Sequence, residues 1–284
     1  MEVIKIFISF LPTIIVGIFY LLVNKRKVNL NNLLNIFLVS FFLIILSTVI
    51  REIIIRPGVI LYLGMQKIIP NLSMEYGFGL FFKAFISAGL CEEIAKWGGI
   101  KVLKPKNKRE IVVFAIFVAT FLSSMENNSF IQRFGLLTGI YRAFMDMHIL
   151  FQVVMAFFMV KAFDKKNKGK KMQSHLIQIL AILIPAILHG IYDAIFWDVT
   201  TEGQSILVPI SFGIFVYGIT FWTIYKYRDY NETEEENPKK ASKGKIIFAI
   251  LVLIFDLYTF KGFENNNVKV EQNNNISYIE NRVE

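Results

Sequence analysis

The chain has 284 residues, of which 55% are hydrophobic and only 19% are charged, and its mean hydropathy is +0.51. This composition excludes a soluble globular protein and indicates that the lipid bilayer is the solvent, while the single cysteine, Cys91, excludes an internal disulfide. The net charge of +9 does not point to nucleic acid, because basic residues collect in the cytoplasmic loops of membrane proteins.

Long apolar runs recur along the chain, and each is close to the roughly 20 residues that a transmembrane helix needs. They predict an all-α protein, a polytopic membrane helix bundle with about eight transmembrane helices. The runs cover residues 3–23, 33–50, 78–100, 111–127, 138–160, 176–197, 206–225 and 246–260. Segment 51–77 contains Arg51, Arg56 and Pro57 among apolar residues, and we expect an interfacial or re-entrant piece there.

The loops between these runs alternate in basic content. Lys and Arg cluster after the first, third, fifth and seventh runs, whereas residues 198–205 contain neither. The positive-inside rule therefore places both termini outside. We expect residues 1–263 to form a single transmembrane helical domain and the Asn-rich residues 264–284 to form a disordered tail. The richness in Ile, Lys, Asn and Phe is typical of an AT-rich bacterial genome, which predicts a multi-pass protein of a bacterial cell membrane.

Ionisable residues inside the predicted helices need an explanation, because a charge at the bilayer centre costs about 2.5–3.5 kcal/mol. They concentrate in the runs from 78–100 to 176–197. Counted from the inner helix ends, Glu92, His148 and His189 lie about 18–20 Å deep and Glu126 about 25 Å deep. We therefore expect these groups to share one layer in the outer half of the membrane.

Residues four apart share one face of a helix, which pairs Glu92 with Lys96 and His189 with Asp193. An imidazole beside a carboxylate suits metal ligation, water activation or oxyanion stabilisation, and spacing does not choose among them. Glu92 with Lys96 also fits a packing ion pair, and a lone histidine fits an interhelical hydrogen bond. A proton-coupled transporter and a non-catalytic membrane scaffold therefore stay open as alternatives to an enzyme.

Four short motifs, in this order, resemble those of the PrsW-type intramembrane proteases and, more remotely, those of the CAAX prenyl endopeptidases. The motifs are Glu92-Glu93-Ile94-Ala95-Lys96 for E-E-x-x-K, Glu126-Asn127 for E-N, Phe144 with His148 for F-x-x-x-H, and His189 with Asp193 for H-x-x-x-D. Lys96 stands four residues after the first glutamate of its motif, whereas the endopeptidases have an arginine one residue further along. This difference favours the PrsW branch.

The resemblance implies hydrolysis of a peptide bond in a membrane-anchored protein near the outer side of the membrane, typically a single-pass anti-sigma factor in a stress-response cascade. The expected partners are this substrate and the lipid bilayer, with no nucleic acid. We expect Glu92 to act as the general base with His148 assisting, and His189 with Asp193 to stabilise the oxyanion directly or through a metal such as zinc. The expected catalytic residues are Glu92, Glu93, Glu126, His148, His189 and Asp193, and the metal ligands, where a metal is used, are His148, His189 and Asp193.

Overall fold

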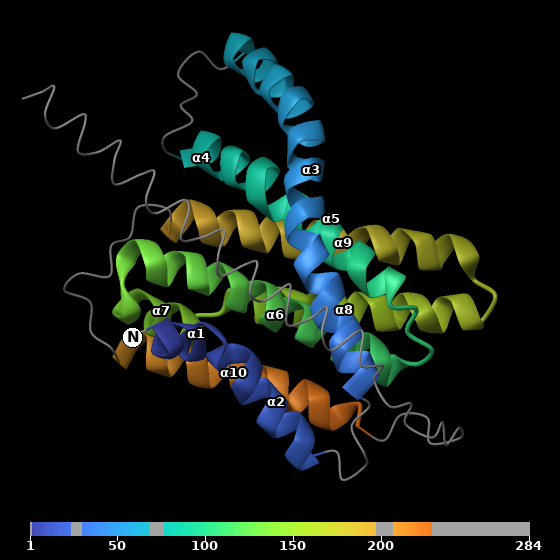
Figure 1. The fold of residues 1–284 in the computed structure, drawn as a ribbon. Helices are drawn as coiled ribbons and strands as arrows, with labels where there is room; N and C mark the ends of the chain where they lie inside the picture. Colours follow the sequence, from blue (N-terminus) through green and yellow to red (C-terminus); the bar gives the residue numbers. More distant parts are fainter. Residues whose placement is uncertain (1, 24–29, 69–76, 197–206, 229–284) are drawn as a thin grey trace, which may run out of the picture.

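The computed structural model describes residues 2–23, 30–68, 77–196 and 207–228, which form a bundle of helices with no strand among them (Figure 1). The predicted all-α class is confirmed. The expected span at 246–260 and the tail at 264–284 lie outside the described residues, so the single-domain assignment stays a prediction.

The first apolar run forms two helices, α1 (Glu2–Ser9) and α2 (Leu11–Val23), which are bent by 59° relative to each other. Proline lacks an N–H group and clashes with the carbonyl one turn earlier, so Pro12 forces this break near the start of α2. The run at 3–23 is therefore a bent pair of helices.

The second run continues much further than expected, in helix α3 (Leu30–Ile68). The prediction that this helix ends near residue 50 is wrong. Arg51 does not interrupt the backbone hydrogen bonds of the helix, and Pro57 removes only one of them. Its 39 residues make α3 about 58 Å long, more than the roughly 30 Å of bilayer hydrocarbon. In Figure 1, α3 crosses the other helices steeply and its distal part projects beyond them.

The third run is helical throughout but contains a π-turn. Helix α4 (Gly77–Ala84) leads into the π-helical segment η1 (Phe85–Gly89), and helix α5 (Leu90–Val102) follows without a break. Such π-turns inside α-helices are frequent at functional sites.

Helix α6 (Lys108–Phe134) is the centre of the bundle, buried along most of its length and in contact with helices on several sides. Helices α7 (Leu136–Phe144) and α8 (Met147–Asn167) follow, separated by a break at Met145 and Asp146, and α9 (Lys171–Phe196) packs along α8. Helix α10 (Leu207–Lys226) contacts α7 and α8.

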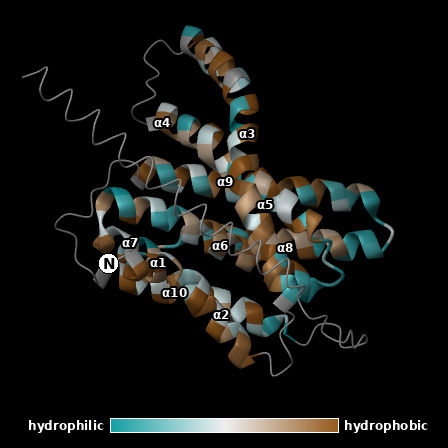
Figure 2. Ribbon diagram, in the orientation of Figure 1, coloured by the Kyte–Doolittle hydropathy of each residue, from teal (hydrophilic) through white to brown (hydrophobic). Residues whose placement is uncertain are grey.

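Within the described residues, four helical stretches are long and apolar enough to cross a membrane, and the bent pair α1–α2 is a fifth candidate. The four stretches are Asn31–Ile55, Lys108–Phe134, Leu136–Asn167 and Lys171–Ile195. The stretch from α4 to α5 is not among them because it carries Lys83, Glu92, Glu93 and Lys96. Figure 2 shows hydrophobic residues over most of the bundle and hydrophilic ones where α8 and α9 meet their connecting turn. The count of eight spans and the outside placement of both termini stay predictions.

Two glycines let the π-turn and α9 pack backbone against backbone. A Cβ atom on Gly89 would lie 2.6 Å from the carbonyl oxygen of Ala186, and one on Gly190 would lie 2.8 Å from the Cα of Phe85. Real Cβ atoms do not approach other atoms this closely, so only glycine fits at either position. The crossing sets the separation of α5 and α9 directly beside Glu92 and His189.

We expect Gly190→Ala to lower the free energy of unfolding by about 1–3 kcal/mol, because the new methyl group must push the backbone of Phe85 away. Thermal unfolding in detergent measures the effect. Gly98→Ala in α5 is the matched control, since a Cβ atom there meets nothing within 4 Å. Equal stability of the two variants would contradict the close crossing.

Candidate active site

Breaks and turns in the helices bring the candidate residues to one place. Glu92 and Glu93 occupy the first turn of α5 directly after the π-turn. His148 occupies the first turn of α8 directly after the break at Asp146. His189 precedes Gly190 on α9, at the close crossing. Residues from three separate helices therefore face each other.

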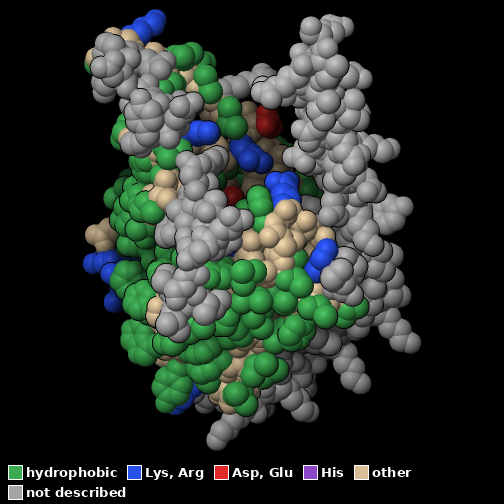
Figure 3. Space-filling model, turned by 90° about the vertical axis from the view of Figure 1, so that its left-hand side faces the viewer, with side chains coloured by type: hydrophobic (Ala, Val, Ile, Leu, Met, Phe, Trp, Pro, Cys, Tyr) green, Lys and Arg blue, Asp and Glu red, His purple; other side chains and the backbone are tan. Residues whose placement is uncertain are grey.

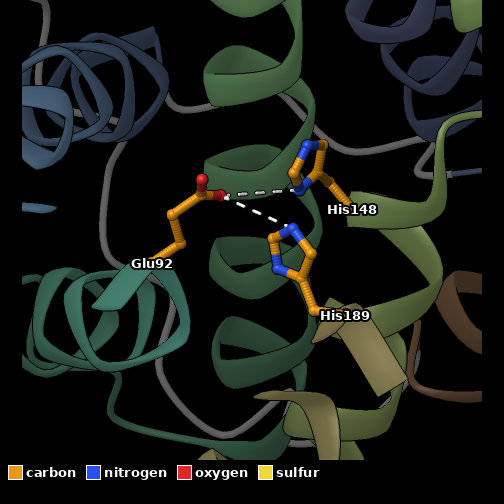
Figure 4. Close-up of side chains that lie close together, drawn as sticks. All are labelled: Glu92, His148 and His189. Atoms are coloured by element: carbon orange, nitrogen blue, oxygen red, sulfur yellow. Dashed lines mark ion pairs between the residues drawn. The ribbon is translucent and has the colours of Figure 1, made fainter. Parts of the chain in front are cut away.

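Glu92, His148 and His189 form a compact cluster (Figure 4). The Oε2 atom of Glu92 lies 3.9 Å from Nδ1 of His148 and 4.0 Å from Nε2 of His189. One ligand atom from each residue lies within 4.8 Å of the other two. Glu92 Oε2 is buried and accepts no hydrogen bond from the described part of the chain. This set of one oxygen and two nitrogen atoms is one that a metal ion can bind.

Each histidine has a carboxylate behind it. Nε2 of His148 lies 3.0 Å from Oε2 of Glu126, and Nδ1 of His189 lies 3.1 Å from Oε1 of Glu93. A carboxylate only accepts hydrogen bonds, so each of these ring nitrogens donates its proton to a glutamate. The other nitrogen of each ring then carries a lone pair on the side of Glu92, where Nδ1 of His148 also accepts from Lys96 at 3.0 Å. In metal sites, carboxylates placed in this way fix the orientation and tautomer of the ligating histidine.

Glu93 is completely buried and joins three helices. Its Oε1 accepts from Lys96 Nζ at 2.7 Å and from His189 Nδ1 at 3.1 Å, while Oε2 accepts from Gln152 Nε2 at 2.7 Å. Lys96, also fully buried, donates to Nδ1 of His148 at 3.0 Å as well. Glu93 and Lys96 therefore tie α5 to α8 and α9, and they leave Glu92 to face outward.

Arg142 on α7 is a component of the site that the sequence analysis missed. Its Nε donates to Oδ1 of Asn127 at 2.9 Å, its Nη2 lies 3.4 Å from Oε2 of Glu126, and its guanidinium lies 3.7 Å from the ring centre of Phe130. It thus holds the glutamate that orients His148. The sequence does contain a signal for Arg142, because it is a charged residue inside the apolar run 138–160. Gln152 was missed too, although it follows His148 by four residues on the same helical face.

A cavity of about 340 Å³ opens over the cluster. Its wall combines residues of α3, η1, α5, α6, α7, α8 and α9 and includes Glu92, Glu126, His148, His189 and Asp193. Figure 3 shows a hollow on this side of the molecule, with acidic and basic side chains inside it and hydrophobic side chains below. The cavity is large enough to hold water and a segment of polypeptide chain next to the cluster.

The predicted site residues thus occupy two levels. Glu92, Glu126, His148, His189 and Asp193 line the cavity, and Oδ2 of Asp193 lies 3.5 Å from Nε2 of His189. Glu93 lies beneath them and does not line it. The compact cluster contains Glu92 where the predicted ligand set has Asp193, and both assignments stay predictions.

Comparison with known proteins gives one family. A sequence profile described as "PrsW family intramembrane metalloprotease" matches residues 13–223. A relative from Clostridioides difficile, named Protease PrsW, is 24% identical over 80% of this chain and 93% of its own length. Relatives of the same name from Oceanobacillus iheyensis and Bacillus subtilis are 29% and 24% identical, each over 60% of this chain and over 77% and 81% of their own lengths. No solved structure matches the chain.

We expect Lys96→Met and Glu93→Gln each to lower the free energy of unfolding by about 3–5 kcal/mol, because each removes one member of the buried 2.7 Å ion pair and leaves Lys96 only Glu92, at 3.5 Å, or leaves Glu93 without its lysine. The double variant should lose less than the sum of the two, since it removes both charges. Denaturant unfolding in detergent measures all three. Lys101→Met, an exposed change on the same helix, should stay within about 0.5 kcal/mol of the parent. Strictly additive losses would show that the two side chains are not coupled.

Proposed function

The chain belongs to the PrsW family of intramembrane proteases, and on this basis we propose that it hydrolyses a peptide bond of a membrane-anchored protein at the Glu92–His148–His189 cluster. Family membership favours a protease over the transporter and the scaffold that the sequence left open. The observation that carries the proposal is the convergence of these three side chains on one cavity within an apolar helix bundle.

The residues present fit a metal ion. Bonds of about 2.0–2.2 Å to nitrogen and oxygen place tetrahedral ligand atoms about 3.4 Å apart. The ligand atoms of Glu92, His148 and His189 lie within 4.8 Å of one another, so shifts of about an ångström suffice. Lys96 would then give up its hydrogen bond to Nδ1 of His148 and keep the shorter one to Glu93. A metal held there would supply Lewis acidity toward the scissile carbonyl and toward water.

We assign different roles to the two carboxylates at the cavity wall. Glu92 completes the ligand set with His148 and His189, because its Oε2 atom lies close to a nitrogen of each ring. Asp193 then accepts the proton from the attacking water, since its carboxylate lines the same cavity beside His189 without belonging to the compact cluster. This exchanges the roles that the sequence analysis gave to Glu92 and Asp193.

Glu93, Glu126 and Arg142 position the histidines. Glu93 orients His189 from below, and Glu126 orients His148 from the side. Arg142 holds Glu126 in place. Such partners of ligating histidines commonly matter by about 10–100-fold in metal affinity or activity.

The finer proposal concerns the substrate. The depth of the polar layer estimated from the sequence supports cleavage near the outer side of the membrane. The resemblance implies a single-pass anti-sigma factor whose cleavage starts a stress response. The polar wall of the cavity suits peptide hydrolysis in general, because the reaction needs water and an unwound segment of chain beside the cluster.

We expect Glu92→Gln, His148→Ala and His189→Ala each to reduce cleavage of a single-pass substrate by at least about a hundredfold, because each removes a member of the cluster. Cleavage by purified protein in proteoliposomes is the measurement. Glu52→Gln and His175→Ala are matched controls, since neither residue lines the cavity. Undiminished cleavage by the cluster variants would reject the proposal.

Metal content separates the two carboxylate roles. Glu92→Gln should lose bound metal together with activity, whereas Asp193→Asn should keep the metal of the parent and lose activity. Elemental analysis of the purified variants, with a His148→Ala, His189→Ala double variant as the metal-free reference, gives the comparison. The reverse result would restore Glu92 as the base and Asp193 as the ligand.

A further inference from the structure

Helix α3 contributes a polar stripe to the wall of the active-site cavity. Ile44, Ser47, Thr48 and Arg51 all line the cavity. They are spaced at i, i+3, i+4 and i+7, so they lie on one face of the helix. The hydroxyls of Ser47 and Thr48 both donate to the carbonyl oxygen of Ile44, and their oxygen atoms keep the capacity to accept hydrogen bonds. A polar stripe is unexpected in a stretch, Asn31–Ile55, that is apolar enough to span a membrane.

Arg51 differs from every other charged side chain in this wall. Glu92 and Asp193 lie beside the histidines, and Glu126 contacts both His148 and Arg142. Within the described ranges, Arg51 makes no hydrogen bond, ion pair or ring contact. The wall of the cavity therefore carries one unpaired positive charge, on the α3 side, opposite the paired charges of the other helices.

An unpaired guanidinium has a strong preference for one kind of ligand. Its planar fork of N–H donors matches a carboxylate, which can accept two parallel hydrogen bonds. Arg51 is exposed and lies near the end of the candidate span Asn31–Ile55, so its guanidinium is accessible to an anion that enters the cavity.

We propose that Arg51 is a specificity-determining residue that binds the carboxylate of an Asp or Glu side chain of the substrate, close to the scissile bond. This inference rests on the proposed function. The same cavity wall contains Arg51, Glu92 and His148, so a chain segment whose peptide bond reaches the cluster passes within reach of Arg51. The substrate class is therefore a membrane-anchored protein with an acidic residue next to its cleavage site.

The test uses a series of single-pass substrates with neutral polar segments, in which one Asp is moved through successive positions across the outer half of the span and its outer flank. Matched series carry Asn or Lys at the same positions. Parent protein, Arg51→Gln and Arg51→Glu are compared in proteoliposomes by kcat/KM. Lys83→Glu on α4 is the matched control, because it makes the same charge change outside the cavity wall.

For the parent protein we expect one position at which Asp is cleaved about tenfold better than Asn, the discrimination that one charge-assisted hydrogen bond provides. Arg51→Gln should remove this preference, Arg51→Glu should shift it to Lys, and Lys83→Glu should leave it unchanged. Equal cleavage of the Asp and Asn substrates at every position would overturn the inference. A fall in kcat/KM by the same factor for all substrates in the Arg51 variants would overturn it too. Either result would leave the proposed protease function intact. Cleavage of no substrate by the parent would remove the proposed function and the inference together.

Discussion

The bundle depends on how it neutralises one buried carboxylate. Glu93 is completely buried between α5, α8 and α9, and it accepts hydrogen bonds from Lys96, His189 and Gln152. A carboxylate in such surroundings is tolerated only when its charge is balanced and its oxygens are occupied. The three donors meet this condition and, because they come from different helices, they also fix the relative positions of those helices. The histidines of the cavity take their places as a result.

Two adjacent glutamates consequently serve opposite purposes. Neighbouring residues of a helix point about 100° apart, so Glu93 enters the core while Glu92 reaches the cavity. The core residue supplies rigidity, and the cavity residue supplies an oxygen atom without a hydrogen bond. Pre-organisation of this kind lets a polar site persist inside an apolar bundle, because the hydrogen bonds of Glu93 hold the cavity side chains in place from beneath.

Much of this site could be predicted from the sequence. Charged residues in apolar runs are rare enough to stand out, and helical depth and spacing placed Glu92, His148 and His189 in one layer. The partition between Glu92 and Glu93 could not be predicted, because it depends on the rotation that the π-turn gives to α5. Arg142 reaches Glu126 because the chain turns at Gly135 and α7 packs back against α6, which no periodicity indicates. The length of α3 could not be predicted because Arg51, Arg56 and Pro57 interrupt the apolar run without interrupting the helix, which loses only one backbone hydrogen bond at Pro57.

The π-turn at Phe85–Gly89 also has a consequence for how this protein can change during evolution. A π-turn holds one residue more than the α-turn it replaces, so removing any single residue there would let the segment relax into a regular α-helix. The residues downstream in α5 would then keep their faces, with Glu93 in the core and Glu92 at the cavity, because the π-turn already accommodates the extra residue. A deletion within the regular helix has no such turn to absorb it and rotates one side of the helix by about 100° relative to the other. The π-turn is thus the place in this segment where the chain can change length while the faces of α5 are kept.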